Sequence, residues 1–268
     1  MKSRLTEVAE VISKVRKQTP LVQAITNYVT INDCANILLA YGASPAMVEA
    51  YDEAYGFAKI SSAIYVNVGT LTKEQEMAAI EASKSAKENN VPLVLDPVGC
   101  GAIPRKIRVI DKMFEIGRID VIKGNAGEIK FLAGEQSGAR GVDSIDDGSG
   151  VLEASKNLAE KYRCIVATTG KVDVITDGTR AAIISNGVEM LTRITGAGCM
   201  LGALCAATAG VEKDRFLAVT AAVVSMGIAG EMAFKESNLP GTFKCKLIDS
   251  IYLLNEEILE KEGRIEWK

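Results

Sequence analysis

The stretch Thr195-Gly196-Ala197-Gly198-Cys199 has residue types that suit the binding of an anion. Its two glycines leave the backbone nearly bare, and the alanine- and leucine-rich segment that follows is typical of a buried helix. A helix start presents unpaired N–H groups and the positive end of the helix dipole, so it attracts groups such as phosphate. A tightly packed turn would use the same glycines, so this stretch alone leaves both interpretations open.

Two carboxylates and one lysine follow in an arrangement that suits Mg²⁺ and nucleotide phosphates. Asp96 and Lys123 end two successive predicted strands, and Glu128 lies in the helix after the second. Mg²⁺ usually takes one or two carboxylates and keeps several of its waters. The alternatives are an Asx turn for Asp96, which precedes Pro97, and a first-turn helix position for Glu128. The other residues at predicted strand ends are Thr26, Asn27, Met47, Gly69, Thr70, Asn125, Thr168, Thr169 and Gly170.

The sequence contains no histidine, which excludes several classes of chemistry. Ser-His-Asp hydrolysis, Cys-His proteolysis and histidine-ligated metals are not available to it. The cysteines at 34, 100, 164, 199, 205 and 245 form no C-x-x-C pair and show no zinc-site spacing. No P-loop or dinucleotide-binding fingerprint is complete. Any chemistry must therefore come from carboxylates, lysine, arginine, cysteine and backbone dipoles.

Composition and charge point to a globular protein without nucleic-acid or membrane partners. The chain has 268 residues, is 48% hydrophobic and carries a net charge of −3. Such a charge gives little bulk attraction to nucleic acid or to membranes. The apolar stretch 217–230 is too short to span a bilayer, and residues 1–15 contain no apolar signal core. We expect a cytoplasmic location.

The elements that must position these residues alternate between strand and helix, which predicts an α/β fold. The apolar strands favour a mainly parallel central sheet with helices on both faces. Short strands near 172–193 favour an antiparallel edge, and no linker divides residues 1–268, so we expect one domain. The predicted strands are 20–27, 44–48, 62–69, 91–96, 119–125, 164–170, 173–178, 180–185 and 188–193. The predicted helices are 3–18, 30–42, 52–60, 72–90, 104–116, one directly after Asn125, 151–162, 197–210, 213–236 and 244–262, with a loop at 134–150.

Motifs along nearly the whole chain, from Pro20 to about Phe243, resemble those of the hydroxyethylthiazole kinases. The motifs are LVQAITNYVTINDCANILLAYGASPAMVEA, NVGTLT, LDPVGCGA, IKGNAGEI, GVD, TGKVDVITDG and TGAGCMLGALCAA, in this order. The resemblance implies a ribokinase-like fold and ATP-dependent phosphorylation of the hydroxyl of 4-methyl-5-(2-hydroxyethyl)thiazole in thiamine salvage. It also implies Mg²⁺, ATP as co-substrate and a homotrimer with sites between subunits.

The resemblance assigns ATP and metal contacts to four residues. It implies ATP contacts at Lys123 and Thr169, and it implies that Asp96 and Glu128 organise Mg²⁺, directly or through water. The family usually has arginine where Lys123 stands. A lysine keeps the charge but lacks the forked donor geometry of a guanidinium.

For the thiazole, the resemblance implies contacts at Met47, Gly196 and Asn27. The family usually has histidine where Gln23 stands, so an ionic or metal role for that position is not available here.

Cys199 is the candidate catalytic residue. Related sugar kinases carry at its position an aspartate that acts as base toward the substrate hydroxyl. We expect the amides of Ala197, Gly198 and Cys199 to form an anion hole for the transferring phosphoryl group, while the thiol orients and assists the hydroxyl. Phosphoryl transfer commonly passes through a loose transition state, so positioning and electrostatics outweigh base strength.

Three other functions remain open from the sequence. One is a kinase of the same fold for another small alcohol, such as hydroxymethylpyrimidine. Another is a ribokinase-like NAD(P)HX dehydratase, although that family carries aspartate after its Gly-x-Gly. The third is a non-catalytic thiazole or thiamine sensor, against which the complete set of Asp96, Lys123, Glu128 and Cys199 argues.

Overall fold

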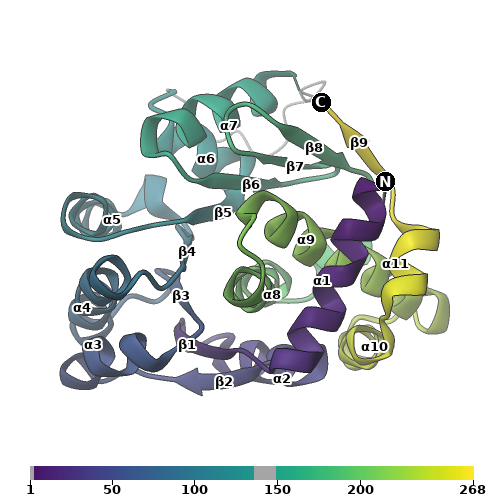
Figure 1. Cartoon of the computed structure of the whole chain (residues 1–268), viewed down its shortest axis with the longest axis horizontal. Coiled ribbons are helices and arrows are strands. Elements are labelled where there is room, and N and C mark those ends of the chain that lie inside the picture. Colours follow the sequence, from purple (N-terminus) through teal and green to yellow (C-terminus); the bar gives the residue numbers. More distant parts are fainter. Residues whose placement is uncertain (1–2, 136–148) are drawn as a thin grey trace.

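The structure is a computed structural model that describes residues 3–135 and 149–268. The described strands are β1 (Leu21–Ile25), β2 (Ser44–Met47), β3 (Ala63–Asn67), β4 (Leu93–Asp96), β5 (Val121–Asn125), β6 (Ile165–Thr169), β7 (Asp173–Thr176), β8 (Ala181–Ile184) and β9 (Ile265–Trp267). They form one sheet in the order β2-β1-β3-β4-β5-β6-β7-β8-β9 (Figure 1). Neighbours from β2 to β6 run parallel, and those from β6 to β9 run antiparallel. The predicted fold class is confirmed.

Helices cover both faces of this sheet, and each face has its own apolar core (Figure 1). One face carries α1 (Arg4–Gln18), α2 (Ile31–Tyr41), α8 (Ala197–Val211), α9 (Arg215–Glu236), α10 (Pro240–Leu253) and α11 (Glu256–Glu262). The other carries α3 (Tyr51–Ile60), α4 (Lys73–Asn89), α5 (Pro104–Ile116), α6 (Ala126–Leu132) and α7 (Ser149–Tyr162). The central parallel strands are buried on both sides, as their near-continuous apolar sequences require.

Local sequence signals set several of the helix ends. Thr72 and Gln75 form a capping box at the start of α4, and Asn90 ends that helix in the left-handed conformation. Pro104 opens α5 at a position where its missing N–H costs no hydrogen bond. Gly42, with φ 101°, ends α2.

Two predicted elements are wrong near the antiparallel edge and the C-terminus. Residues 188–193 were predicted to be a strand, but Glu189–Arg193 form the 3₁₀ helix η2, and β9 takes the place beside β8. The predicted helix 244–262 is two helices, because Asn255 accepts a hydrogen bond from the backbone N–H of Ile258 and starts α11 anew. The predicted loop 134–150 and the GVD motif at 141–143 lie largely or wholly outside the described residues.

The helix α9 is long and apolar enough to cross a membrane by length and composition. However, 83% of its most apolar window is buried inside the fold, where it packs against α8 and α10. Burial of this kind is typical of a core helix, because the neighbouring helices cover its apolar side chains.

Candidate active site

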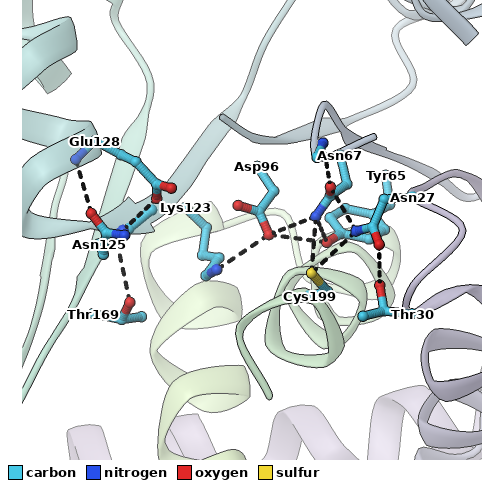
Figure 2. Close-up of polar contacts among 12 residues, drawn as sticks. Asn27, Thr30, Tyr65, Asn67, Asp96, Lys123, Asn125, Glu128, Thr169 and Cys199 are labelled. Carbon is cyan, nitrogen blue, oxygen red and sulfur yellow. Dashed lines mark hydrogen bonds and ion pairs between the residues drawn. The ribbon is translucent and has the colours of Figure 1, made fainter. Parts of the chain in front are cut away.

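The carboxyl ends of the parallel strands bring the predicted polar residues to one edge of the sheet (Figure 2). Asp96 is the last residue of β4, Lys123 lies near the end of β5, and Asn27 follows β1. The first turn of α8 lies against this edge and carries Cys199. A single parallel sheet thus places residues that are up to 172 positions apart in sequence within hydrogen-bonding distance of one another.

The Asp96 carboxylate is the centre of this cluster, and its side chain is wholly buried. Its Oδ2 atom accepts hydrogen bonds from Lys123 Nζ (3.2 Å), Asn67 Nδ2 (3.1 Å) and the Tyr65 hydroxyl (3.1 Å). Its Oδ1 atom has no partner. A buried carboxylate oxygen without a partner is costly, so this atom is available to a cation.

Burial and charge act together on the ionisable groups of this cluster. Burial raises the pKa of Asp96, and the charge of Glu128 adds to the rise, while the Lys123 ammonium opposes it. Burial disfavours the Lys123 ammonium, but the carboxylates of Asp96 and Glu128 outweigh it and raise the pKa of Lys123. Burial and the Asp96 charge raise the pKa of Tyr65 well above its ordinary value, so Tyr65 keeps its proton and donates.

The Cys199 sulfur accepts two hydrogen bonds from side-chain amides. Asn27 Nδ2 and Asn67 Nδ2 each lie 3.3 Å from Sγ. Asn27 is itself held by Thr30, whose hydroxyl donates to Asn27 Oδ1 at 3.2 Å. Cys199 is only partly buried, whereas the two asparagines are buried, so the amides hold the sulfur from inside the fold and leave the residue partly open to solvent (Figure 2).

The two glycines of the α8 start are required for close approach. Gly196 has φ 93°, and a Cβ there would lie 2.9 Å from Thr30 Cγ2. A Cβ on Gly198 would lie 3.1 Å from Lys123 Nζ, so the ammonium sits against the first turn of α8. Gly198 is exposed. The helix start therefore offers accessible backbone beside a buried cation, an arrangement that suits an anion.

Glu128 has a structural contact through each of its carboxylate oxygens. Oε1 accepts from the backbone N–H of Gly99 at 2.9 Å, and Oε2 accepts from that of Asn125 at 2.8 Å. Asn125 returns a bond to the backbone N–H of Glu128, which completes a capping box for α6. Glu128 thus ties the loop after β4 to the end of β5, as the helix-start interpretation expected, and its electrostatic effect reaches Asp96.

The remaining predicted residues lie at the same edge with looser connections to the cluster. The Thr169 hydroxyl donates to the Gly124 carbonyl oxygen at 3.3 Å, next to Lys123. Met47 ends β2, pairs with Ala24 of β1 and is partly buried. Gln23 lies elsewhere, because its amide donates to the Ala54 carbonyl oxygen of α3 on the opposite face of the sheet.

The described residues include no group of three or more His, Cys, Asp or Glu side chains arranged to hold a metal ion. The unpartnered, buried Oδ1 of Asp96 and the nearby charge of Glu128 still fit Mg²⁺, because Mg²⁺ takes few protein carboxylates and completes its shell with water and phosphate oxygens.

Sequence reasoning missed two residues of the cluster, Tyr65 and Asn67. It placed the functional end of the third strand at Gly69 and Thr70, whereas β3 ends at Asn67, whose side chain contacts Asp96 and Cys199. A signal was present, because Asn67 is a lone amide within the apolar run 63–68. Tyr65 gave no such signal, because an aromatic residue in a buried strand is ordinary.

Comparisons with known proteins agree on one family. The sequence profile of the hydroxyethylthiazole kinase family matches residues 12–257. A hydroxyethylthiazole kinase of Clostridium kluyveri is 64% identical over 264 residues, which cover 98% of each chain. The solved structure of a hydroxyethylthiazole kinase from Pyrococcus horikoshii is 37% identical, with a TM-score of 0.91, and covers 98% of this chain and 99% of that chain.

A more distant solved structure shows how widely the fold is shared. The pyridoxal kinase of Staphylococcus aureus, in complex with AMP-PCP and pyridoxal, has a TM-score of 0.59 at 16% identity, covering 79% of this chain and 87% of that chain. At this identity the likeness shows the fold alone, which is the ribokinase-like one that the sequence predicted.

Proposed function

The chain belongs to the hydroxyethylthiazole kinase family, and from this premise we propose that it transfers the γ-phosphoryl group of ATP to the hydroxyl of 4-methyl-5-(2-hydroxyethyl)thiazole at the start of α8. One observation carries the placement of the reaction. The accessible turn Gly196–Cys199 lies beside the buried Lys123 ammonium and the Asp96 carboxylate, at the edge of the sheet where ligands of parallel α/β folds bind. A helix start, a cation and a carboxylate together are what phosphoryl transfer needs.

Binding of the triphosphate relies on Lys123, Thr169 and the first turn of α8. The Lys123 ammonium is held in place by Asp96 and lies close to Gly198, so it offers positive charge to a phosphate at the exposed backbone of that turn. Thr169 lies on the neighbouring strand β6 and lines the ATP side. The amides of Ala197, Gly198 and Cys199 form an anion hole that stabilises the transferring phosphoryl group.

Asp96 and Glu128 are the residues that would hold Mg²⁺, Asp96 through its unpartnered Oδ1. When bound, the metal neutralises charge on the phosphates. Glu128 keeps its two backbone contacts in this proposal, so a water-mediated role suits it better than direct ligation.

Asn27, Met47 and Gly196 hold the thiazole, and Cys199 acts on its hydroxyl. The amides of Asn27 and Asn67 orient the sulfur, so that as a thiol it can accept a hydrogen bond from the attacking hydroxyl, and as a thiolate it can take the hydroxyl proton and become the thiol. Because the transition state is loose, the hydroxyl loses little of its proton before transfer, and orientation is the larger contribution of Cys199.

We also propose that the chain acts as a single kinase domain over residues 1–268, as a homotrimer and in the cytoplasm. Tyr28 and Val29, directly after Asn27, are 54% and 60% exposed, which supports a partner subunit or substrate covering this side of the site. All six cysteines are free, which supports a reducing compartment. Light scattering of the purified protein tests the trimer.

The direct test of function mixes the protein with Mg·ATP and hydroxyethylthiazole and detects the phosphorylated thiazole by mass spectrometry. Parallel reactions with hydroxymethylpyrimidine and with hydrated NADH test the two enzymatic alternatives. Phosphorylation of the thiazole in preference to the pyrimidine supports the proposal. Binding of the thiazole without turnover would support a sensor and overturn it.

A further inference from the structure

We propose that Asn67 is a positioning residue for phosphoryl transfer, whose side-chain amide sets the orientation of both the Asp96 carboxylate and the Cys199 sulfur. The inference rests on the proposed function for its link to catalysis. The contacts themselves are properties of this chain, and Figure 2 shows the hydrogen bonds from the Asn67 amide to both groups.

The orientation of the Asn67 amide is fixed by a backbone group. Asn67 Oδ1 accepts from the backbone N–H of Gly69 at 2.9 Å and from Asn27 Nδ2 at 3.0 Å. A backbone N–H can only donate, so the carbonyl oxygen of the amide must face Gly69. The NH₂ group of Asn67 must therefore face the other way, toward Asp96, Cys199 and the Tyr65 hydroxyl.

This orientation decides which oxygen of Asp96 is free. Asn67 Nδ2 and the Tyr65 hydroxyl both donate to Oδ2, as does Lys123, while Oδ1 keeps no partner. Rotation of the carboxylate would break these bonds and direct the free oxygen away from its present position. By holding Asp96 Oδ2, Asn67 therefore helps to fix the rotamer of Asp96 in which Oδ1 is available to a cation.

The same NH₂ group orients the thiol. Asn67 and Asn27 each donate to Sγ at 3.3 Å, so the sulfur is an acceptor toward the protein. The S–H proton, which is not needed in these two contacts, is free to point toward a ligand. The buried Asn67 amide thus links Asp96, the proposed metal ligand, to Cys199, which is proposed to orient the acceptor hydroxyl.

Asn67 is only 2% exposed, so its contacts in the wild-type protein are shielded from bulk water. An alanine at this position would remove the acceptor of the Gly69 N–H and one acceptor of Asn27 Nδ2. It would also remove one of the three donors to Asp96 Oδ2. Loss of a partner that orients a metal ligand typically costs roughly 10- to 100-fold in metal affinity or activity.

The test compares Asn67→Ala with Asn27→Ala as the matched control. Both variants remove one amide donor from the Cys199 sulfur, but only Asn67 contacts Asp96. Calorimetric titration with the non-hydrolysable analogue AMP-PCP at a series of Mg²⁺ concentrations measures the Mg²⁺ needed for half-maximal binding. This readout needs no acceptor and no turnover.

We expect Asn67→Ala to raise the Mg²⁺ requirement roughly 10-fold or more and to lower kcat by roughly 10- to 100-fold, as for other partners of metal ligands. Asn27→Ala should leave the Mg²⁺ requirement within about twofold, because it does not contact Asp96. An equal Mg²⁺ requirement in the two variants, or a kcat of Asn67→Ala within twofold of wild type, would overturn the inference.

Two provisions keep the test decisive. If Asn67→Ala yields no folded protein, Asn67→Ser replaces it, since a hydroxyl can still satisfy the Gly69 N–H but does not reach both Asp96 and Cys199; the same outcomes apply. A wild-type protein that binds Mg·AMP-PCP but does not phosphorylate the thiazole would refute the proposed function, and the comparison of Mg²⁺ requirements would still decide the role of Asn67.

Discussion

Replacing Lys123 by methionine removes the ammonium that faces the wholly buried Asp96 carboxylate while largely keeping the length of the side chain. Removing one partner of a buried ion pair typically costs roughly 3–5 kcal/mol of unfolding free energy. Asp96 Oδ2 would keep its bonds from Asn67 and Tyr65, so we expect the lower end of this range, about 3 kcal/mol. For a chain of this size such a loss lowers Tm by roughly 6–12 °C.

The pH dependence of this loss has a definite sign. Burial raises the pKa of Asp96, and without the opposing Lys123 ammonium the folded-state pKa of Asp96 rises further. A carboxyl whose folded pKa exceeds its unfolded pKa of about 3.9 contributes most stability below that value and loses it as pH rises through the folded pKa. The deficit of Lys123→Met relative to wild type should therefore shrink as the pH is lowered from about 7.5 to about 5.

Urea denaturation of the metal-free protein across this pH range measures the effect. Lys84→Met is the control, because Lys84 forms a partly exposed ion pair with Glu81 in α4, and its loss should cost less than about 1 kcal/mol. If Lys123→Met lies within about 1 kcal/mol of wild type near pH 7.5, or if its deficit does not change with pH, the buried pair does not have the energetic role assigned to it.

Three further predictions concern the thiol, the glycine turn and a carboxyl near the ATP side. Cys199→Asp should retain measurable turnover, whereas Cys199→Ala should lower kcat by roughly 10²-fold, more than it changes KM; an alanine variant with wild-type kcat at saturating substrates would rule out a catalytic role. Gly196→Ala should lower the unfolding free energy by about 2 kcal/mol, because φ is positive and the new Cβ would crowd Thr30, while Gly241→Ala, which meets nothing within 4 Å, should change it by less than about 1 kcal/mol; equal effects in urea denaturation would contradict the strain. Burial raises the pKa of Asp173 to about 7, so the contribution of this carboxyl to stability should be lost as pH rises from about 4 to 7; Asp173→Asn should match wild type below about pH 4 and exceed it by roughly 1–3 kcal/mol above pH 7, and a difference between the two proteins that does not change with pH would refute this.

The sequence predicted the parallel part of the fold well because its signals there are local and strong. Apolar strands alternate with amphipathic helices from 4 to 132, and polar residues suited to ligand binding stand at several strand ends. Because ligands of parallel α/β sheets bind beyond the carboxyl ends of the strands, Asp96, Lys123 and Asn27 could be placed together without any knowledge of side-chain positions. In the structure all three belong to one hydrogen-bonded cluster.

The errors arose where a local pattern competes with a long-range contact. Residues 188–193 have the composition of a strand, but the place beside β8 is taken by Ile265–Trp267, a three-residue strand too short to give a periodic signal. In the C-terminal helices the apolar spacing of Leu247, Ile251, Leu254 and Ile258 continues across the break, so the weaker capping signal of Asn255 was overlooked.

The side-chain network could not be predicted for a different reason. Which oxygen of Asp96 is bonded, and that Asn67 reaches both Asp96 and Cys199, depend on rotamers and on the position of α8 over the sheet. Local sequence patterns reveal neither the rotamers nor the position of α8, because residues 67, 96 and 199 meet only after the sheet and α8 have packed together.

A crystal structure with Mg²⁺, AMP-PCP and hydroxyethylthiazole tests the central claim most directly. We expect the γ-phosphate at the backbone N–H groups of Ala197–Cys199, next to Lys123, with the thiazole hydroxyl between that phosphate and the Cys199 sulfur. A triphosphate bound elsewhere, with the turn at 196–199 contacting neither ligand, would contradict the account.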